Sequence, residues 1–168
     1  VLIYMAGHGT TKNDRYLFVP YIEREVDLPA AMELSLDDRR IVALWSTLPV
    51  RNSLLMLDTC HAASFNMEFA GRLQNETGRL VLAAAHQQAV DRVPQERHGP
   101  FALAVHEALR GQVARALVAG GTDQLTLGFH VRDRVPVLAE KALIDQRVSF
   151  RLTNGELPSP FLLTKAVR

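Results

Sequence analysis

The chain has 168 residues, of which 48% are hydrophobic and 22% are charged, with a formal net charge of +1. This length and composition are typical of a globular domain with its own hydrophobic core, and we expect one domain over residues 1–168. A charge near zero gives no electrostatic reason to expect nucleic acid or an anionic membrane as a partner. No apolar stretch approaches the roughly 20 residues that cross a bilayer. A single cysteine suits the reducing cytoplasm, which is the expected location.

Strand-like and helix-like segments alternate along the chain, which predicts an α/β fold with a mostly parallel sheet flanked by helices. Three uninterrupted apolar runs are the candidates for buried strands: Val1–Ala6, Leu54–Leu57 and Leu80–Ala85. A tight turn is expected at 7–10 and a loop or frayed helix at 62–78. Shorter extended pieces are expected at 16–19, 148–152 and 161–164. Helices are predicted from a cap at Ser35 to about Leu48, from Pro100 to Gly111, and from about Thr126 to Ile144.

Polar side chains directly follow two of these apolar runs. His8 stands between two glycines after the first run, and Asp58, Thr59 and Cys60 follow the second. The carboxyl ends of parallel strands share one edge of a sheet, where open α/β sheets place their ligand chemistry. We therefore expect a histidine and a cysteine to meet at that edge.

Cys60 and His8 are predicted to form a thiolate–imidazole pair. A cysteine attacks a carbonyl carbon as its thiolate, and an adjacent imidazole accepts the thiol proton and later protonates the leaving amine. The backbone N–H groups of Gly9 and Cys60 are the candidate donors to the oxyanion of the tetrahedral intermediate. A glycine after His8 would also let a substrate carbonyl approach the bare backbone.

These motifs carry a family resemblance. The segment Tyr4–Gly9 (Y-M-A-G-H-G) resembles the histidine element of caspase-like cysteine peptidases, and Leu55–His61 (L-M-L-D-T-C-H) resembles their nucleophile element in its metacaspase form. Cys60 follows His8 by about 50 residues, as in caspases. Segments 82–91, 98–101 and parts of 124–135 are similar to later elements of the family, in the family's order. The chain thus resembles bacterial caspase homologues over nearly its whole length.

The resemblance implies a caspase–haemoglobinase-like fold and a cysteine endopeptidase. In this reading Cys60 is the nucleophile and His8 is the general base and acid. Asp58 matches the acidic residue that lines the S1 pocket of metacaspases. The expected partner is therefore a protein or peptide substrate with Arg or Lys at P1, held by a charge-assisted hydrogen bond. The resemblance implies no cofactor.

The resemblance also implies a segment that binds the substrate backbone. Ala89, Val90 and Asp91 match the strand that pairs with the substrate, and Asp91 is a second candidate acid near S1. Arg72 and Arg79 precede the next predicted strand, in what we expect to be a surface loop that would tolerate autocleavage. The family's first strands normally come before the histidine element and are missing from this chain, so we expect a further domain or a companion chain to supply them.

Other interpretations stay open at this point. A lone cysteine in an α/β protein is commonly a buried apolar filler, and Asp58 or Asp91 can be a capping or solvated residue. One alternative function is a catalytically silent caspase-like module that regulates or binds other proteins. Another is a small-molecule hydrolase or transferase that uses Cys60. No metal site is predicted, because neither paired cysteines nor an H-x-x-x-H spacing accompanies His8 and Cys60.

Overall fold

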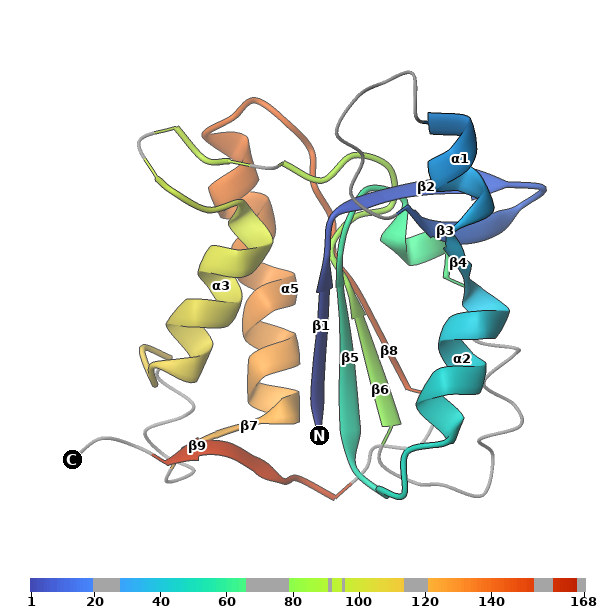
Figure 1. The fold of residues 1–168 in the computed structure, drawn as a ribbon. Helices are drawn as coiled ribbons and strands as arrows, with labels where there is room; N and C mark the ends of the chain where they lie inside the picture. Colours follow the sequence, from blue (N-terminus) through green and yellow to red (C-terminus); the bar gives the residue numbers. More distant parts are fainter. Residues whose placement is uncertain are drawn as a thin grey trace.

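The computed structural model describes residues 1–19, 28–65, 79–90, 92–94, 96–113, 121–152 and 159–165. In these ranges the chain is a mixed α/β fold with a four-stranded central sheet between helices (Figure 1). In spatial order the strands are β1 (Leu2–Ala6), β5 (Ser53–Asp58), β6 (Arg79–Ala83) and β8 (Ser149–Leu152). The first three are parallel and β8 is antiparallel to β6. The predicted α/β class with a mostly parallel sheet is confirmed.

Helices cover both faces of this sheet. One face carries α3 (Pro100–Leu109) and α5 (Gln124–Glu140), and the opposite face carries α2 (Asp38–Ser46), as Figure 1 shows. Strand β5 is buried between these layers, which explains its unbroken apolar run. Its Leu54 and Met56 pack in the core beneath α3 and α5, while Leu55 and Leu57 pack beneath α2. None of the described helices is both long enough and apolar enough to cross a membrane.

The predicted starts of α2 and α5 are wrong by a few residues. Asp37, not Ser35, caps α2: its side chain accepts a hydrogen bond from the backbone N–H three residues further on, at 2.8 Å. The Ser35 hydroxyl instead donates to a carbonyl in α1 (Leu28–Glu33) at 2.9 Å. Asp123, not Thr126, caps α5 and accepts from the Thr126 N–H at 2.6 Å. In both helices a carboxylate takes the cap, where its charge also interacts favourably with the helix dipole.

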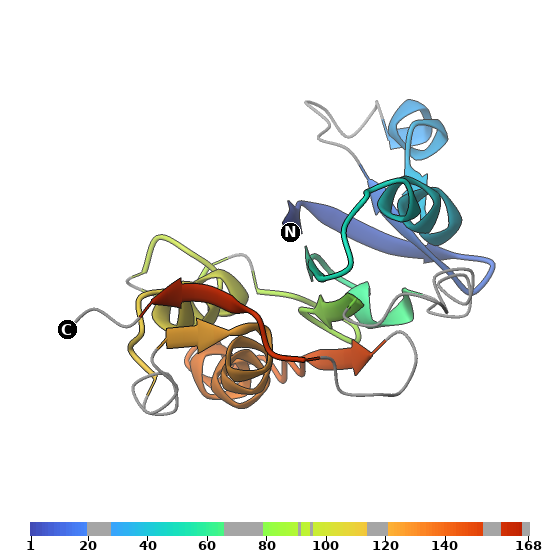
Figure 2. The ribbon, with the colours of Figure 1, turned by 90° about the horizontal axis from the view of Figure 1, so that it is seen from below.

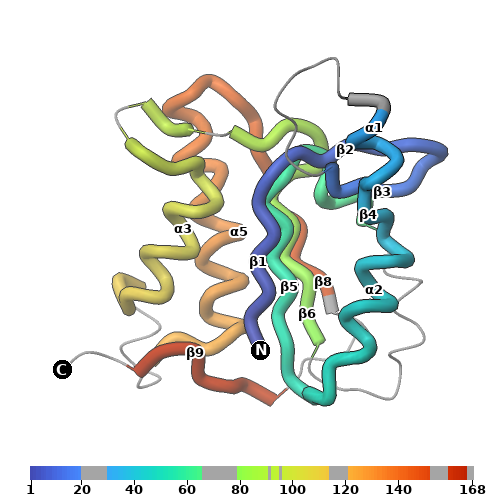
Figure 3. Tube along the Cα trace, viewed as in Figure 1, coloured from blue at the N-terminus to red at the C-terminus, as the bar shows by residue number. Residues whose placement is uncertain are grey.

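The chain bends sharply at the carboxyl end of β1 into a second, antiparallel sheet (Figure 3). This sheet consists of β2 (His8–Lys12), β3 (Arg15–Val19) and β4 (Leu36–Asp37). The prediction of a tight turn over residues 7–10 is wrong for residues 8–10, which belong to β2. Only Gly7, at a φ of +154° that favours glycine, forms the bend, and His8 begins a strand opposite Val19. A third sheet pairs β7 (Gly121–Asp123) with β9 (Leu162–Lys165), which lie side by side in Figure 2.

Arg79 begins β6 and is buried, so its predicted place in a surface loop is wrong. Its guanidinium donates to the carbonyls of Trp45, Leu48 and Val50 at 2.5, 3.2 and 3.3 Å. It also lies 5.5 Å from the centre of the Trp45 ring, within the range of a cation–π contact. Arg79 therefore ties β6 to the end of α2 and is not accessible to a protease. Arg72 lies outside the described residues.

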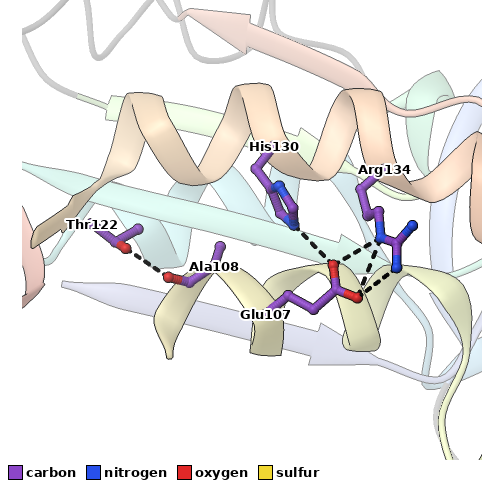
Figure 4. Close-up of polar contacts among 5 residues, drawn as sticks. All are labelled: Glu107, Ala108, Thr122, His130 and Arg134. Carbon is purple, nitrogen blue, oxygen red and sulfur yellow. Dashed lines mark hydrogen bonds and ion pairs between the residues drawn. The ribbon is translucent and has the colours of Figure 1, made fainter. Parts of the chain in front are cut away.

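A polar cluster joins α3 to α5 (Figure 4). Two nitrogen atoms of Arg134 donate to the Glu107 carboxylate at 2.9 Å, and His130 Nε2 contacts the same carboxylate at 3.1 Å. The hydrogen bonds from Arg134, followed by the contact with His130, hold the pKa of Glu107 below its ordinary value. Nearby, the Thr122 hydroxyl donates to the Ala108 carbonyl at 2.6 Å. These contacts fasten together the helix pair that covers one face of the sheet.

Among the described strands, β1 forms one edge of the central sheet. Apolar side chains on this strand and directly before it are partly uncovered: Leu2 and Tyr4 are 39% and 42% exposed, and Val1 is 53% exposed. A pocket of about 380 Å³ with an almost wholly apolar lining lies between β1 and α2. The expectation of a single domain over residues 1–168 stays a prediction.

Candidate active site

The carboxyl ends of β1 and β5 bring the histidine and cysteine segments to one edge of the sheet. Ala6 lies opposite Asp58 in the parallel register, and the Gly7 N–H donates to the Asp58 carbonyl at 3.4 Å. His8 and Cys60 each follow two residues later. His8 is exposed at the start of β2, and Cys60 is half-buried.

The surroundings of Gly9 show how tightly the His8 segment packs against the Cys60 segment. A Cβ atom added at Gly9 would overlap the carbonyl oxygen of Cys60 and lie 2.5 Å from Thr59 Oγ1. The β2 backbone beside His8 therefore rests directly on Cys60. The glycine expected to admit a substrate carbonyl is needed here for the approach of the chain's own backbone.

The backbone of Cys60 is also supported from the side of β3. The Thr59 hydroxyl donates to the Cys60 carbonyl at 3.0 Å and shares a 2.7 Å hydrogen bond with Tyr16 Oη. Tyr16 is fully buried. Burial raises the pKa of Tyr16 to about 12, and proximity to Cys60 adds to the rise, while the Thr59 hydrogen bond acts in the opposite direction. Tyr16 thus keeps its proton at neutral pH and holds Thr59 against Cys60.

The sulfur of Cys60 faces the segment 84–90 that follows β6. The Ala89 N–H donates to Cys60 Sγ at 3.4 Å. The neighbouring His61 adopts a left-handed conformation, with a φ of 54°, and its N–H donates to the Gln87 carbonyl at 2.7 Å. The Cys60 thiol also faces the carbonyl oxygen of Ala89, at 3.9 Å from Sγ. Segment 84–90 therefore forms the second wall of the site.

Of the three residues expected to bind the substrate backbone, two are described. Ala89 lies against Cys60, while Val90 is buried and its N–H is already bonded to Gln146 Oε1 at 2.9 Å. Any pairing of Val90 with a substrate would therefore use its carbonyl. Asp91, the second candidate acid, lies outside the described residues.

Asp58 ends β5 and accepts a hydrogen bond from Tyr4 that no motif in the sequence indicates. Tyr4 Oη donates to Asp58 Oδ2 at 2.5 Å, and the Tyr4 ring lies 6.2 Å from the ring of Phe101 on α3. Partial burial, together with the charge and hydrogen bond of Asp58, raises the pKa of Tyr4 above its ordinary value. Tyr4 is thus a permanent donor that orients this carboxylate. A basic P1 side chain would have to share Asp58 with Tyr4.

An open polar pocket of about 870 Å³ adjoins these segments. Three segments line it: the tip of the β2–β3 hairpin, the residues that follow Cys60 and the residues that precede Ala89. The lining residues are Thr11, Asp14, His61, Ser64, His86, Gln87 and Gln88. Neither His8, Cys60 nor Asp58 lines it, so it lies beside the predicted pair and not on it.

Gln146 is a further residue of the site, and no motif in the sequence indicates it. It follows α5, is fully buried, and contacts backbone atoms 56 and 62 positions away in the sequence. Only the folded arrangement brings these atoms together. In the described part of the chain, no group of three or more His, Cys, Asp or Glu side chains is arranged to hold a metal ion.

Comparisons with known proteins assign no family to this chain. No family model matches the sequence. A search of curated proteins finds no match either. The likeness to caspase-like peptidases therefore rests on the motifs around His8 and Cys60, and the family, the activity and the cytoplasmic location stay predictions.

Proposed function

We propose that this protein is a caspase-like cysteine endopeptidase that cleaves peptide bonds after Arg or Lys. The observation that carries the proposal is the close packing of Gly9 on Cys60 where β1 and β5 end. It brings the backbone that carries His8 to the backbone that carries Cys60, whose sulfur is half-buried against Ala89. A cysteine kept only as an apolar filler would have no need of the Ala89 N–H at its sulfur.

The chemistry needs only the two side chains and backbone donors. His8 accepts the proton of the Cys60 thiol, and the thiolate attacks the peptide carbonyl carbon to form a carbon–sulfur bond. The resulting oxyanion would be held by the N–H groups of Gly9 and Cys60, donors whose loss typically costs about 10²- to 10³-fold in rate. The intermediate then expels the amine, which takes the proton from His8, and leaves a thioester.

Hydrolysis of the thioester completes the cycle. His8 accepts a proton from water, and the hydroxide attacks the thioester carbonyl carbon. The carbon–sulfur bond breaks, the carboxylic acid product leaves, and the Cys60 sulfur recovers its proton through His8.

Asp58 is the residue proposed to select the basic P1 side chain. An arginine can donate two parallel hydrogen bonds to a carboxylate, which gives both charge and geometric selectivity. Tyr4 supports this role because its hydroxyl, at 2.5 Å, restricts the orientation of Asp58 before a substrate arrives. A pre-oriented carboxylate loses less conformational entropy when it binds.

The proposal is tested with fluorogenic peptides that differ only at P1 (Arg, Lys, Asp or Ala), cleaved by the complete protein. We expect turnover after Arg and Lys only, abolished in Cys60→Ala and in His8→Ala. A preference for Asp would keep the peptidase and refute the role of Asp58. Absence of turnover, together with an inert Cys60, would refute the peptidase and favour the silent regulatory module. Turnover of simple esters or amides without a basic residue would favour the small-molecule enzyme.

A further inference from the structure

Gln146 holds both ends of the segment that faces the Cys60 sulfur. Its Oε1 accepts a hydrogen bond from the Val90 N–H at 2.9 Å, and its Nε2 donates to the Ala84 carbonyl at 3.0 Å. The side chain is fully buried, so water does not compete for either bond. One amide thus closes the segment 84–90 into a loop of fixed width.

The contacts of this loop with the cysteine lie between the two clamped ends. Ala89, whose N–H donates to Cys60 Sγ at 3.4 Å, is bonded directly to Val90. Holding the Val90 N–H therefore restricts the peptide unit that joins the two residues and the direction of the Ala89 N–H. At the other end, the Ala85 carbonyl accepts from the Ala63 N–H at 2.9 Å and keeps the loop beside the nucleophile segment.

We propose that Gln146 is a positioning residue for Cys60: by clamping Ala84 and Val90 it keeps the backbone of Ala89 against the sulfur and so sets the reactivity of the thiol. Gln146 does not touch the sulfur itself and acts through the loop. Its importance for peptide cleavage rests on the proposed function, whereas its effect on the thiol does not.

An amide is the side chain that this position requires. It offers one acceptor and one donor at the same time, which match one backbone N–H and one backbone carbonyl. An aliphatic side chain of similar size would leave both backbone groups buried without a partner, and the loop would rearrange to find others.

The chain contains a matched control. Gln124, at the start of α5, is also fully buried and makes the same two kinds of bond: its Oε1 accepts from the Phe161 N–H at 2.7 Å, and its Nε2 donates to the Ser159 carbonyl at 3.1 Å. Neither partner belongs to segment 84–90. Replacing Gln124 thus removes an equivalent buried amide without touching the loop at Cys60.

The test uses alkylation, because Cys60 is the only cysteine. The rate of carbamidomethylation by iodoacetamide is followed by intact mass from pH 5 to pH 10 for the wild type, Gln146→Leu and Gln124→Leu. Loss of the fixed backbone contact at the sulfur should slow the alkylation of Gln146→Leu about fivefold at pH 7. Gln124→Leu should keep the wild-type rate.

A second variant keeps the proposal refutable if Gln146→Leu does not fold. Ala89→Pro removes the donated N–H and leaves Gln146 in place, so it should also slow the alkylation of Cys60. A wild-type rate in Ala89→Pro, or in folded Gln146→Leu, would overturn the proposal, as would equal losses of rate in Gln146→Leu and Gln124→Leu. Alkylation does not depend on peptide cleavage. Slowed alkylation without peptidase activity would refute the proposed function alone, and normal cleavage with unchanged alkylation rates would refute the role of Gln146 alone.

Discussion

Replacing Gly9 with alanine tests the packing that brings the His8 and Cys60 segments together. The added Cβ would lie 2.5 Å from Thr59 Oγ1 and 2.8 Å from Thr59 Cβ, and would overlap the Cys60 carbonyl oxygen. The main obstacle is backbone, so no rotation of a side chain can relieve it. The β2 strand must therefore move away from Cys60.

The size of that movement sets the expected loss of activity. Non-bonded carbon atoms pack at about 3.5 Å, so β2 must retreat by about 1 Å. A misplacement of about 1 Å between catalytic groups costs about 10²-fold in rate. Overpacking of this kind destabilises a fold by about 1–3 kcal/mol. We thus expect Gly9→Ala to fold and to lose about 10²-fold in kcat/KM.

The assay compares kcat/KM on an arginyl peptide with the melting temperature of each variant. Gly128→Ala, on helix α5, is the control. The added Cβ would lie 2.5 Å from the ring of Phe150 on β8. That variant should lose stability yet keep the wild-type kcat/KM, because the overlap is with a movable ring away from Cys60. Wild-type kcat/KM in Gly9→Ala, or equal losses in both variants, would refute the argument.

Three further predictions concern the framework of the site. The pKa of Tyr16 is raised from 10.0 to about 12, so the stability it confers is full below pH 10 and falls above it by about 1.4 kcal/mol per pH unit. In urea unfolding from pH 9 to 11.5, the free energy of unfolding of Tyr16→Phe should lack this fall. The same pH dependence in Tyr16→Phe and the wild type would contradict the prediction. Arg79→Met leaves buried carbonyls without their donor and should lower the free energy of unfolding by about 3 kcal/mol, measured by urea titration. A decrease of less than about 1 kcal/mol would contradict this prediction. Glu107→Gln should cost about 1 kcal/mol at neutral pH through weaker bonds to Arg134 and His130. Because the pKa of Glu107 is lowered, that difference from wild type should shrink as pH falls below its ordinary value of 4.5, and a difference independent of pH would count against it.

The central sheet was predictable because burial on both faces leaves a direct trace in the sequence. The run at Leu54–Leu57 has no polar interruption, and a strand between two helical layers requires that pattern. The strand β2 left no such trace. His8–Lys12 contains no apolar residue except the small Gly9, and it is extended because it pairs with β3. Pairing with a distant or later strand overrides weak local preference.

The candidate site was predictable only in its outline. Its strand-end residues follow from the apolar runs, but its supporting contacts join residues far apart in the sequence. Tyr4 reaches Asp58 across 54 positions and Gln146 reaches Val90 across 56. The position of Arg79 was predicted wrongly. Arginines are rarely buried, so a surface position was expected, but the side chain is buried. The carbonyls at the end of α2 make its burial possible, and no local pattern indicates them.

The most direct test of the central claim is labelling of the complete protein with peptidyl chloromethyl ketones that carry Arg or Asp at P1, followed by intact-mass and peptide analysis. If His8 and Cys60 form a working pair beside Asp58, the arginyl reagent adds once per chain, on Cys60. Labelling should then be lost in His8→Ala, slowed in Asp58→Asn, and much slower with the aspartyl reagent. Equal labelling by both reagents, or labelling unaffected by His8→Ala, would contradict the claim.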